Sequence, residues 1–355
     1  MKKIVILITG GGAPGIAGTV YALKNNPDGQ IFRIVTTDVK ADVVGRYLTD
    51  SFYKVPPPEH KDFIKTVIKI AKKENVDVIL PQTTRELLVF AKHRKDFIKE
   101  SISVVISSYQ SIKTANDKLL FLEKAKKIGI SYPSYFLTNS QNSLKRAINV
   151  LGFPAKKVIV KPRIANGMRG LRVITKDPWN VERFLRSKPE GVEISLDNLL
   201  KILGNGIWPE LLVMEYLPGD EYTVDMFRGK SGSVVIPRLR QTIRSGITFD
   251  AQVRLRKDII EYCRKLAEEL DLFYCFGFQF REDANGLPKI IECNPRVQGT
   301  MVTSAFAGFN IIYYSVMEAL NKKAAVGKTI LKDRINFIRY WGGVAVYENK
   351  FIGKV

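Results

Sequence analysis

The residues best suited to chemistry lie in one stretch of the C-terminal third of the chain. Gln279 lies within an apolar-rich run at 277–281, and Glu292 and Asn294 lie in a second run at 288–296. Residues typical of tight turns separate the two runs. The pattern predicts a β-hairpin that carries polar side chains near the middle of one strand and at the end of the other.

The spacing of these side chains suggests a metal site. Glu292 and Asn294 are two residues apart in a strand, so both point to the same face of the hairpin. Gln279 can face them across an antiparallel ladder. Oxygen donors of this kind suit Mg²⁺ held against a nucleotide phosphate. A hairpin whose polar ends simply face water is the alternative, and these residues alone do not decide between the two.

Basic residues further upstream suggest a phosphate site. Lys161 ends the apolar strand predicted at 158–162, and a buried lysine is costly unless it has a partner. A loop rich in Gly, Asn and Arg follows at 163–170, and a strand is predicted at 171–174. The tip of such a hairpin can fold over phosphates, with main-chain N–H groups and arginines facing them. A plain surface hairpin remains the alternative.

A second pair of strands carries opposite charges. Glu221 lies in an alternating segment at 220–225, and Arg238 and Arg240 share a face of the strand that follows. These charges either pair across the strands or form a phosphate clamp.

These side chains depend on the elements that hold them, and the first 112 residues alternate between strand and helix patterns. This alternation predicts a parallel sheet with helices on both faces. The turn at 10–15 matches the G-x-G-x-x-G fingerprint of dinucleotide binding, and Asp38 follows at a suitable distance. However, Pro14 removes one N–H group from this loop. We therefore favour a small anionic or carboxylate substrate at the loop and near Gln82–Glu86 over a nicotinamide dinucleotide.

The remaining elements are read from capping residues and periodicity. Thr114 is expected to cap a helix that contains Lys118 and ends near Gly129. One long helix is expected over 251–270, another over 310–320, and closing strands over 335–347. Within the N-terminal region, Arg85 or Glu86 are candidates for reading a substrate, although both are also ordinary first-turn helix residues.

The composition excludes several classes of function. The chain has 355 residues, of which 45% are hydrophobic, and a formal net charge of +21. Lysine and arginine are spread along the chain, which favours a solvated basic surface over a nucleic-acid partner. No apolar run reaches the length of a membrane span. The cysteines show no paired spacing, so we expect no disulfide framework, no zinc site and a cytoplasmic location.

Taken together, the order of these motifs resembles the ATP-grasp superfamily. The elements of the resemblance are Lys118 at a helix start, Lys161-Pro162 before a glycine loop, Glu215-Tyr216-Leu217 before Pro-Gly and Glu221, and finally Gln279 with Glu292-Cys293-Asn294-Pro295-Arg296. The chain looks most like one synthetase module of the carbamoyl phosphate synthetase large subunit and like single-module amino acid ligases. The implied fold is α/β and α+β: a parallel, Rossmann-like pre-ATP-grasp domain at 1–113, a small ATP-grasp subdomain at 114–190, and a large subdomain with antiparallel sheets at 191–355.

The resemblance also implies cofactors and residue roles. ATP and two Mg²⁺ ions, with Mn²⁺ as a substitute, are the expected cofactors. Lys118 and Lys161 would contact the phosphates and the adenine side. Glu215 and Leu217 would hold the adenine through main-chain groups, and Glu221 would accept the ribose hydroxyls. The loop residues Asn166, Gly167, Arg169 and Gly170 would close over the phosphates. Gln279, Glu292 and Asn294 would hold the metals, and the catalytic set would be Arg240, Arg296 and Asn294.

The implied activity is that of an ATP-dependent carboxylate–amine ligase acting through an acyl phosphate. Its partners would be a small carboxylate and an amine or ammonia, with no membrane and a homodimer as one possible assembly. Gln279 stands where many ligases of the superfamily have a carboxylate, and it matches the carbamoyl phosphate synthetase pattern. The alternatives are an NAD(P)-dependent oxidoreductase that uses the loop at 10–15 and a non-catalytic ATP sensor. A nucleic-acid binder is a further alternative that the dispersed charge disfavours.

Overall fold

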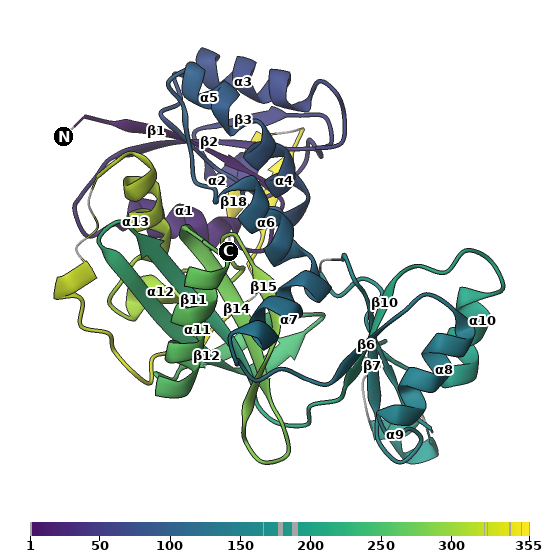
Figure 1. Ribbon diagram of the computed structural model, residues 1–355. Coiled ribbons are helices and arrows are strands. Elements are labelled where there is room, and N and C mark those ends of the chain that lie inside the picture. Colours follow the sequence, from purple (N-terminus) through teal and green to yellow (C-terminus); the bar gives the residue numbers. More distant parts are fainter. Residues whose placement is uncertain are drawn as a thin grey trace.

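A computed structural model describes residues 2–165, 167–176, 180–186, 191–322, 324, 326–340, 342–348 and 350–354. Figure 1 shows a small subdomain, built around β6, β7 and β10, that projects from a larger body. The larger body combines the N-terminal sheet with a long antiparallel sheet. None of the helices among the described residues is long and apolar enough to cross a membrane.

The N-terminal sheet is parallel and five-stranded, with strand order β3-β2-β1-β4-β5. Its strands are β1 (Ile4–Thr9), β2 (Phe32–Asp38), β3 (Ser51–Lys54), β4 (Val78–Leu80) and β5 (Ser103–Val104), and its helices are α1 (Ile16–Lys24), α2 (Gly45–Leu48), α3 (Phe63–Lys73), α4 (Thr84–Lys92) and α5 (Arg94–Lys99). The apolar run of β1 is buried on both faces, as the centre of a parallel sheet requires. The predicted parallel α/β unit is therefore confirmed.

The small subdomain has a five-stranded sheet with order β6-β10-β7-β8-β9. Its elements are β6 (Tyr135–Thr138), α8 (Gln141–Val150), β7 (Val158–Pro162), β8 (Arg172–Ile174), α9 (Val181–Arg186), β9 (Glu193–Ile194), α10 (Leu196–Leu203) and β10 (Leu211–Glu215). Strands β7 and β8 pair antiparallel, which confirms the predicted hairpin after Lys161. The boundary expected at residue 190 would cut through this sheet. We therefore propose that the subdomain continues to the end of β10.

The large sheet has six strands in the order β15-β14-β11-β12-β13-β16. They are β11 (Glu221–Gly229), β12 (Gly232–Arg244), β13 (Ile247–Val253), β14 (Tyr274–Glu282), β15 (Pro288–Asn294) and β16 (Asn336–Ile338). The helix expected over 251–270 is wrong in its first part, because Ala251 and Val253 belong to β13 and pair with Arg240 and Arg238. Only α11 (Lys257–Glu269) is helical.

Two helices lead from the N-terminal sheet into the small subdomain. They are α6 (Tyr109–Asn116), capped by Ser108, and α7 (Lys118–Lys127), capped by Asp117. The side chain of Asp117 accepts hydrogen bonds from the N–H groups of Leu119 and Leu120. The expectation that Thr114 is a helix cap is therefore wrong. The capping groups lie at Ser108 and Asp117, so Thr114 falls inside α6.

The C-terminal segment returns to the larger body. It contains α12 (Thr303–Phe306), α13 (Ile311–Ala319), the short 3₁₀ helix η1 (Val326–Lys328), and the hairpin of β17 (Val344–Tyr347) and β18 (Lys350–Lys354). Strands were expected at 335–347, and β16 and β17 lie there. Of these, β16 extends the large sheet, whereas β17 pairs only with β18 in a separate two-stranded sheet.

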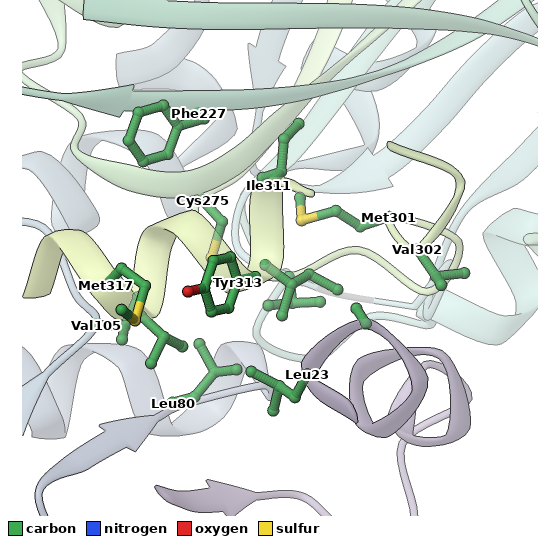
Figure 2. Close-up of a cluster of buried hydrophobic side chains, with 14 of the residues drawn as sticks. Leu23, Leu80, Val105, Phe227, Cys275, Met301, Val302, Ile311, Tyr313 and Met317 are labelled. Carbon is green, nitrogen blue, oxygen red and sulfur yellow. The ribbon is translucent and has the colours of Figure 1, made fainter. Parts of the chain in front are cut away.

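Helix α13 joins the N-terminal sheet to the large sheet through one hydrophobic core. Figure 2 shows Ile311, Tyr313 and Met317 packed between Leu23 and Leu80 of the N-terminal domain and Phe227 of the large sheet. The Tyr313 hydroxyl donates a hydrogen bond to Asp28 at 2.7 Å. The opposite face of the large sheet is covered by α7 and α11. The two sheets are thus one structural body.

Candidate active site

The β14–β15 hairpin places the predicted metal ligands next to one another. Gln279 is directly opposite Glu292, and Asn294 is opposite Gly277. A β-bulge follows, because Phe280 pairs with Ile290 and leaves Ile291 unpaired. The predicted hairpin and the facing of Gln279 toward Glu292 are both present, whereas nothing in the sequence indicated the bulge.

The donor set fits a hard cation. Gln279 and Asn294 contribute amide groups and Glu292 a carboxylate, and the Asn294 Nδ2 group donates to Glu292 Oε1 at 3.1 Å. Turning the Asn294 amide over would present its oxygen to the same point, and oxygen ligands are those that Mg²⁺ prefers. Among the described residues no cluster of three or more His, Cys, Asp or Glu side chains is suited to a metal ion. A site here therefore depends on one carboxylate assisted by two amides.

Two buried lysines face Glu292 from different elements. Lys118 begins α7, and its Nζ donates to the carbonyl of Ala165 at 2.6 Å. Lys161 lies in β7, and its Nζ donates to the carbonyl of the bulged residue Ile291 at 3.2 Å. Burial lowers the pKa of both ammonium groups, to about 8 for Lys161, while the nearby Glu292 raises it in part. These cations lack full carboxylate compensation, which suits a polyanionic ligand.

Arg296 follows the metal-ligand strand and reaches the N-terminal domain. Its Nε donates to Thr84 Oγ1 at 2.9 Å, and its Nη2 donates to Asn294 Oδ1 at 3.3 Å. Burial lowers the pKa of this guanidinium, and Glu292 partly opposes that effect. Thr84, Lys118, Glu292 and Asn294 line one small void of about 20 Å³. The structure therefore brings Arg296, both lysines and the hairpin ligands to one place.

The loop that follows Lys161 covers this place. Gly167, Met168 and Gly170 all have positive φ values, of 60°, 59° and 75°. Gly246, in the turn between β12 and β13, lies beneath Met168, since a Cβ built there would be 2.5 Å from the methionine sulfur. Arg169 lies in this exposed loop, whereas Asn166 lies outside the described residues. The carbonyl of Ala165, just before Asn166, occupies the Lys118 ammonium in this conformation.

The remaining predicted nucleotide contacts lie at the hinge between the subdomains. Glu215 ends β10, and its carboxylate accepts hydrogen bonds from Lys289 Nζ at 2.9 Å and from the Ser134 N–H at 3.0 Å. Leu217 is buried two residues later. The Glu215 side chain is engaged, which is compatible with the predicted use of main-chain groups for the adenine. The residue roles themselves stay predictions.

Glu221 and Arg240 form an ion pair. The sequence alone had not decided between such pairing and a phosphate clamp. Arg240 Nη1 donates to Glu221 Oε1, its Nε donates to Thr248 Oγ1, and its Nη2 donates to the Gly246 carbonyl. Arg281 lies 3.6 Å from the other Glu221 oxygen. Arg238 is fully buried and paired with Asp225 at 2.7 Å. Cross-strand pairing of opposite charges therefore describes both arginines in this conformation.

Three N–H groups of the glycine loop at 10–15 donate hydrogen bonds within the protein. The N–H groups of Gly11, Gly12 and Ala13 donate to the Thr37 carbonyl, the Asp38 carboxylate and the Gly10 carbonyl. An open cavity of about 480 Å³ lies beside the loop, lined by Gly12, Ala13, Asp38, Lys40, Asp42, Val43, Val44 and Thr83. Two carboxylates and one lysine line this cavity, and the small anionic ligand expected at the loop stays a prediction.

Two further residues lie near these sites. The sequence indicated Glu86 only weakly and did not indicate Arg339. Glu86 is buried in α4, accepts a hydrogen bond from the Thr9 hydroxyl, and has a pKa that burial raises to about 7. Its position three residues after Thr83, which precedes α4, is that of the acidic residue in a capping box, although the Thr83 side chain makes no cap hydrogen bond. Arg339, just after β16, reaches the glycine loop and the segment after Arg296. No motif surrounds Arg339, so only the fold reveals it.

Two parts of the chain match models of known protein families. Residues 208–338 match a family described as ATP-grasp in the biosynthetic pathway with Ter operon, and residues 6–105 match the PylC-like N-terminal domain. These matches confirm the expected resemblance to the ATP-grasp superfamily and the expected fold class.

Among curated proteins, the carbamoyl phosphate synthase large chain of Clostridium acetobutylicum is 23% identical over 306 residues. That match covers 83% of this chain but only 25% of the relative, so the chain spans about a quarter of the length of that protein. This coverage agrees with the expectation of a single module.

Solved structures of the same fold include synthetases and carboxylases. The N5-carboxyaminoimidazole synthetase of Staphylococcus aureus, complexed with ADP, has a TM-score of 0.66 at 18% identity and covers 90% of this chain and 78% of its own. The biotin carboxylase domain of Hydrogenobacter thermophilus 2-oxoglutarate carboxylase, solved with MgADP and bicarbonate, has a TM-score of 0.67 at 17% identity, over 90% and 70%. These comparisons lend no support to the nicotinamide-dependent alternative.

Proposed function

We propose that this protein is an ATP-dependent carboxylate–amine ligase that works through an acyl phosphate. The observation that carries the proposal is the convergence of Lys118, Lys161 and Arg296 on the surface formed by Glu292 and Asn294. These residues come from α7, β7 and the β15 end, far apart in the sequence. Phosphoryl transfer depends on positioning and on positive charge at the phosphate oxygens, and the site supplies both.

The nucleotide would lie in the hinge between the two ATP-grasp subdomains. Main-chain groups from Glu215 to Leu217 would hold the adenine, and Glu221 would accept the ribose hydroxyls once it exchanges its partner Arg240. Lys118 would release the Ala165 carbonyl and bind phosphate oxygens together with Lys161. The loop with Gly167, Arg169 and Gly170 would then close over the phosphates.

Gln279, Glu292 and Asn294 would hold the divalent cations that accompany ATP. Bound Mg²⁺ would offset the phosphate charge at that surface. Two ions are our preferred number, and Mn²⁺ would offer the same oxygen-ligand chemistry as Mg²⁺. With only one carboxylate, this chain leaves more of the charge compensation to its lysines and arginines.

The reaction would proceed in two steps. A carboxylate oxygen attacks the terminal phosphorus of ATP, the bond to the bridging oxygen breaks, and ADP leaves. Arg296 and Arg240 would stabilise the negative charge on the transferring group. An amine or ammonia then attacks the acyl carbon, the carbon–nitrogen bond forms, phosphate leaves, and the nitrogen loses a proton to solvent. No histidine or thiol nucleophile is needed, and Cys293 is buried in the core.

Release of ADP from Mg·ATP tests this proposal. We would measure it against pooled carboxylates, with and without pooled amines, and against bicarbonate with ammonia. ADP that depends on a carboxylate supports acyl activation, and a further dependence on the amine supports ligation. ADP with bicarbonate alone points to carbamoyl phosphate chemistry.

A matched pair of variants connects the turnover to the site. Glu292→Gln keeps the size of the side chain but removes the carboxylate, and it should abolish ADP release without changing the melting temperature by more than a few degrees. Glu318→Gln changes a carboxylate on α13, outside the site, and should retain activity. Full activity in Glu292→Gln would remove this residue from the metal site, and tight ATP binding with no turnover in any pool would favour a nucleotide sensor.

A further inference from the structure

Arg163 lies just after β7, at the base of the loop that covers the site, and contacts two other elements. Its Nε donates to both carboxylate oxygens of Asp117 at 2.9 Å, and its Nη2 lies 2.8 Å from Asp117 Oδ2. Its Nη1 donates to Glu210 Oε2 at 3.1 Å. The main chain joins the same elements, because the Arg163 N–H donates to the Glu210 carbonyl at 3.0 Å and its carbonyl accepts from the Lys118 N–H at 3.3 Å. One residue thus holds the start of α7 against the adjoining ends of β7 and β10.

This contact crosses the boundary between the two subdomains. Helix α7 packs on the large sheet, because its residue Phe121 lies in the core of that sheet. Strands β7 and β10 contribute Val160 and Leu211 to the separate core of the small subdomain. The pair of Arg163 and Asp117 therefore joins the two bodies between which the nucleotide would lie, at the point where the phosphates would lie.

The geometry of the pair is fixed from several sides. The side chain of Asp117 is 9% exposed and that of Arg163 is 22% exposed, so solvent screens this pair less than a surface ion pair. The same carboxylate accepts hydrogen bonds from the N–H groups of Leu119 and Leu120 at the start of α7. A carboxylate held by the guanidinium and by two main-chain groups keeps one orientation, so Arg163 and the helix cap together set where α7 begins.

Lys118 is the residue that depends on this arrangement, since it follows Asp117 directly. It is buried, and its Nζ donates to the carbonyl of Ala165, two residues beyond Arg163. A lysine head group on a long flexible stem is costly to order, and a fixed backbone at the start of the stem lowers that cost. The contacts of Arg163 therefore hold the base of the lysine that would meet the phosphates.

We propose that Arg163 is a positioning residue for nucleotide binding, which acts through Lys118 by pairing with Asp117. This inference rests on the proposed function, because it requires Lys118 to bind a phosphate oxygen. Lys118 can exchange the Ala165 carbonyl for a phosphate while α7 stays in place, since Arg163 keeps its own contacts at the base of the loop. An arginine suits this task, because its planar fork binds one carboxylate with two groups and leaves a third for Glu210.

Calorimetric titration with a non-hydrolysable Mg·ATP analogue tests whether Arg163 acts through Lys118. The proteins are the wild type, Arg163→Gln, Lys118→Gln and the double variant, each measured well below its own melting temperature. Arg163→Gln should raise the dissociation constant by about tenfold, and Lys118→Gln by at least as much. The double variant should bind no more weakly than Lys118→Gln, because the arginine has no effect once the lysine is gone. An arginine with a merely structural role would leave the affinity unchanged or add its own loss to that of Lys118→Gln.

Asp117→Asn separates position from charge. Asparagine caps a helix as well as aspartate does, so α7 keeps its start while Arg163 loses its carboxylate partner. The substitution also removes a negative charge near the site, which by itself would favour a polyanion, so weaker binding reports the lost position. We expect Asp117→Asn to bind the analogue more weakly than the wild type, and Arg163→Lys, which keeps the charge but not the fork, to fall between the wild type and Arg163→Gln. Arg186→Gln is the matched control, because Arg186 forms an exposed pair with Glu182 on α9, and it should bind as the wild type does.

Three results would overturn the proposal. They are wild-type affinity in Arg163→Gln, additive losses in the double variant with Lys118→Gln, and wild-type or tighter binding in Asp117→Asn. These titrations need no acid, amine or turnover, so they separate this inference from the ligase activity. Weaker binding in these variants of a protein that releases no ADP with any acid would leave Arg163 in place and contradict the activity. Carboxylate-dependent ADP release with an indifferent Arg163 would do the reverse, and a wild type that binds no analogue would contradict both.

Discussion

Lys161 is buried in β7, and its chemistry depends on pH. Burial lowers the pKa of its ammonium to about 8, while Glu292 and Glu221 raise it and Lys118 lowers it further. The lysine is therefore charged at neutral pH but close to losing its proton. A bound phosphate would restore the charge, so nucleotide binding and protonation are linked at this residue.

This linkage predicts a pH-dependent affinity for ATP. Below about pH 8 Lys161 already carries its proton, whereas above it each binding event must recapture one, so affinity should fall by up to tenfold per pH unit. Calorimetric titration with a non-hydrolysable Mg·ATP analogue measures this. Lys161→Gln should bind more weakly and show a flatter pH profile, which isolates Lys161 from Lys118. Identical slopes for the two proteins would remove Lys161 from the nucleotide site.

The buried carboxyl group of Glu86 leads to a second prediction, about how the stability of the fold depends on pH. Its pKa is about 7 in the fold, because burial disfavours the charged form, against an ordinary value of 4.5. The folded state thus keeps a proton that the unfolded state releases, so stability should fall as the pH rises from about 4.5 to about 7, by about 3 kcal/mol. Urea unfolding of wild type and Glu86→Gln, at about pH 5 and about pH 8, should show this loss only in the wild type.

The control for Glu86 is Glu59, an exposed carboxylate whose pKa is lowered through a main-chain hydrogen bond and Arg85. Glu59→Gln should leave the pH dependence of unfolding close to that of the wild type. If Glu86→Gln loses stability between the two pH values as the wild type does, the buried carboxyl is not the source of the effect.

The β14–β15 hairpin is the element on which the site depends. Gly277 faces Asn294 across the ladder, and Gln298 occupies the space above it, donating to the Val224 carbonyl at 2.9 Å. A Cβ on Gly277 would lie 1.5 Å from Gln298 Nε2 and 2.5 Å from the Val224 carbonyl oxygen. Gly277→Ala should therefore destabilise the protein by several kcal/mol, on the order of 3.

Gly206 offers the matched control for this substitution. A Cβ there meets no atom within 4 Å, so Gly206→Ala should change the free energy of unfolding by less than about 0.5 kcal/mol. Urea unfolding of both variants measures the difference. A Gly277→Ala variant as stable as the wild type would show that the 295–298 segment can move away from the hairpin at little cost.

Alternation and turn residues were enough to predict this hairpin and the facing of Gln279 and Glu292. The bulge at Ile291 was not predictable, because it is fixed by the partner strand and by Lys161, which donates to the bulge carbonyl. The error at 251–270 has a similar cause. Ala251 and Val253 are compatible with either a helix or a strand, and their pairing with β12 decides the outcome.

At the scale of the whole molecule, the hydrophobic cores divide the chain into units that differ from the domains expected from the sequence. The N-terminal sheet shares its core with α13 and the large sheet, whereas the small subdomain has a core of its own. Contacts of this kind, such as Tyr313 with Asp28, join residues almost three hundred positions apart and leave no local signal. The order of motifs nevertheless indicated the superfamily, because nucleotide contacts depend on residue types at fixed places along the chain.

This division predicts two units in amide hydrogen exchange. Val316→Ala, in α13, should speed exchange in β1 and β4 but not in β7 or β10, because Val316 belongs to the shared core. Leu144→Ala, in α8, should do the opposite, since Leu144 lies in the core of the small subdomain. Each truncation should cost about 2 to 4 kcal/mol locally. Uniform acceleration of exchange by both variants would show that the molecule opens as a single unit.

The most direct test of acyl phosphate formation follows one oxygen atom. With an acid that supports ADP release, the carboxylate is labelled with ¹⁸O and the inorganic phosphate is analysed by mass spectrometry. Because the carboxylate oxygen attacks the terminal phosphorus and the acyl–oxygen bond later breaks, the label should pass to phosphate, one atom for each ADP formed. Phosphate without label, at the same rate of ADP release, would mean that water rather than the carboxylate accepts the phosphoryl group, and would contradict the ligase mechanism.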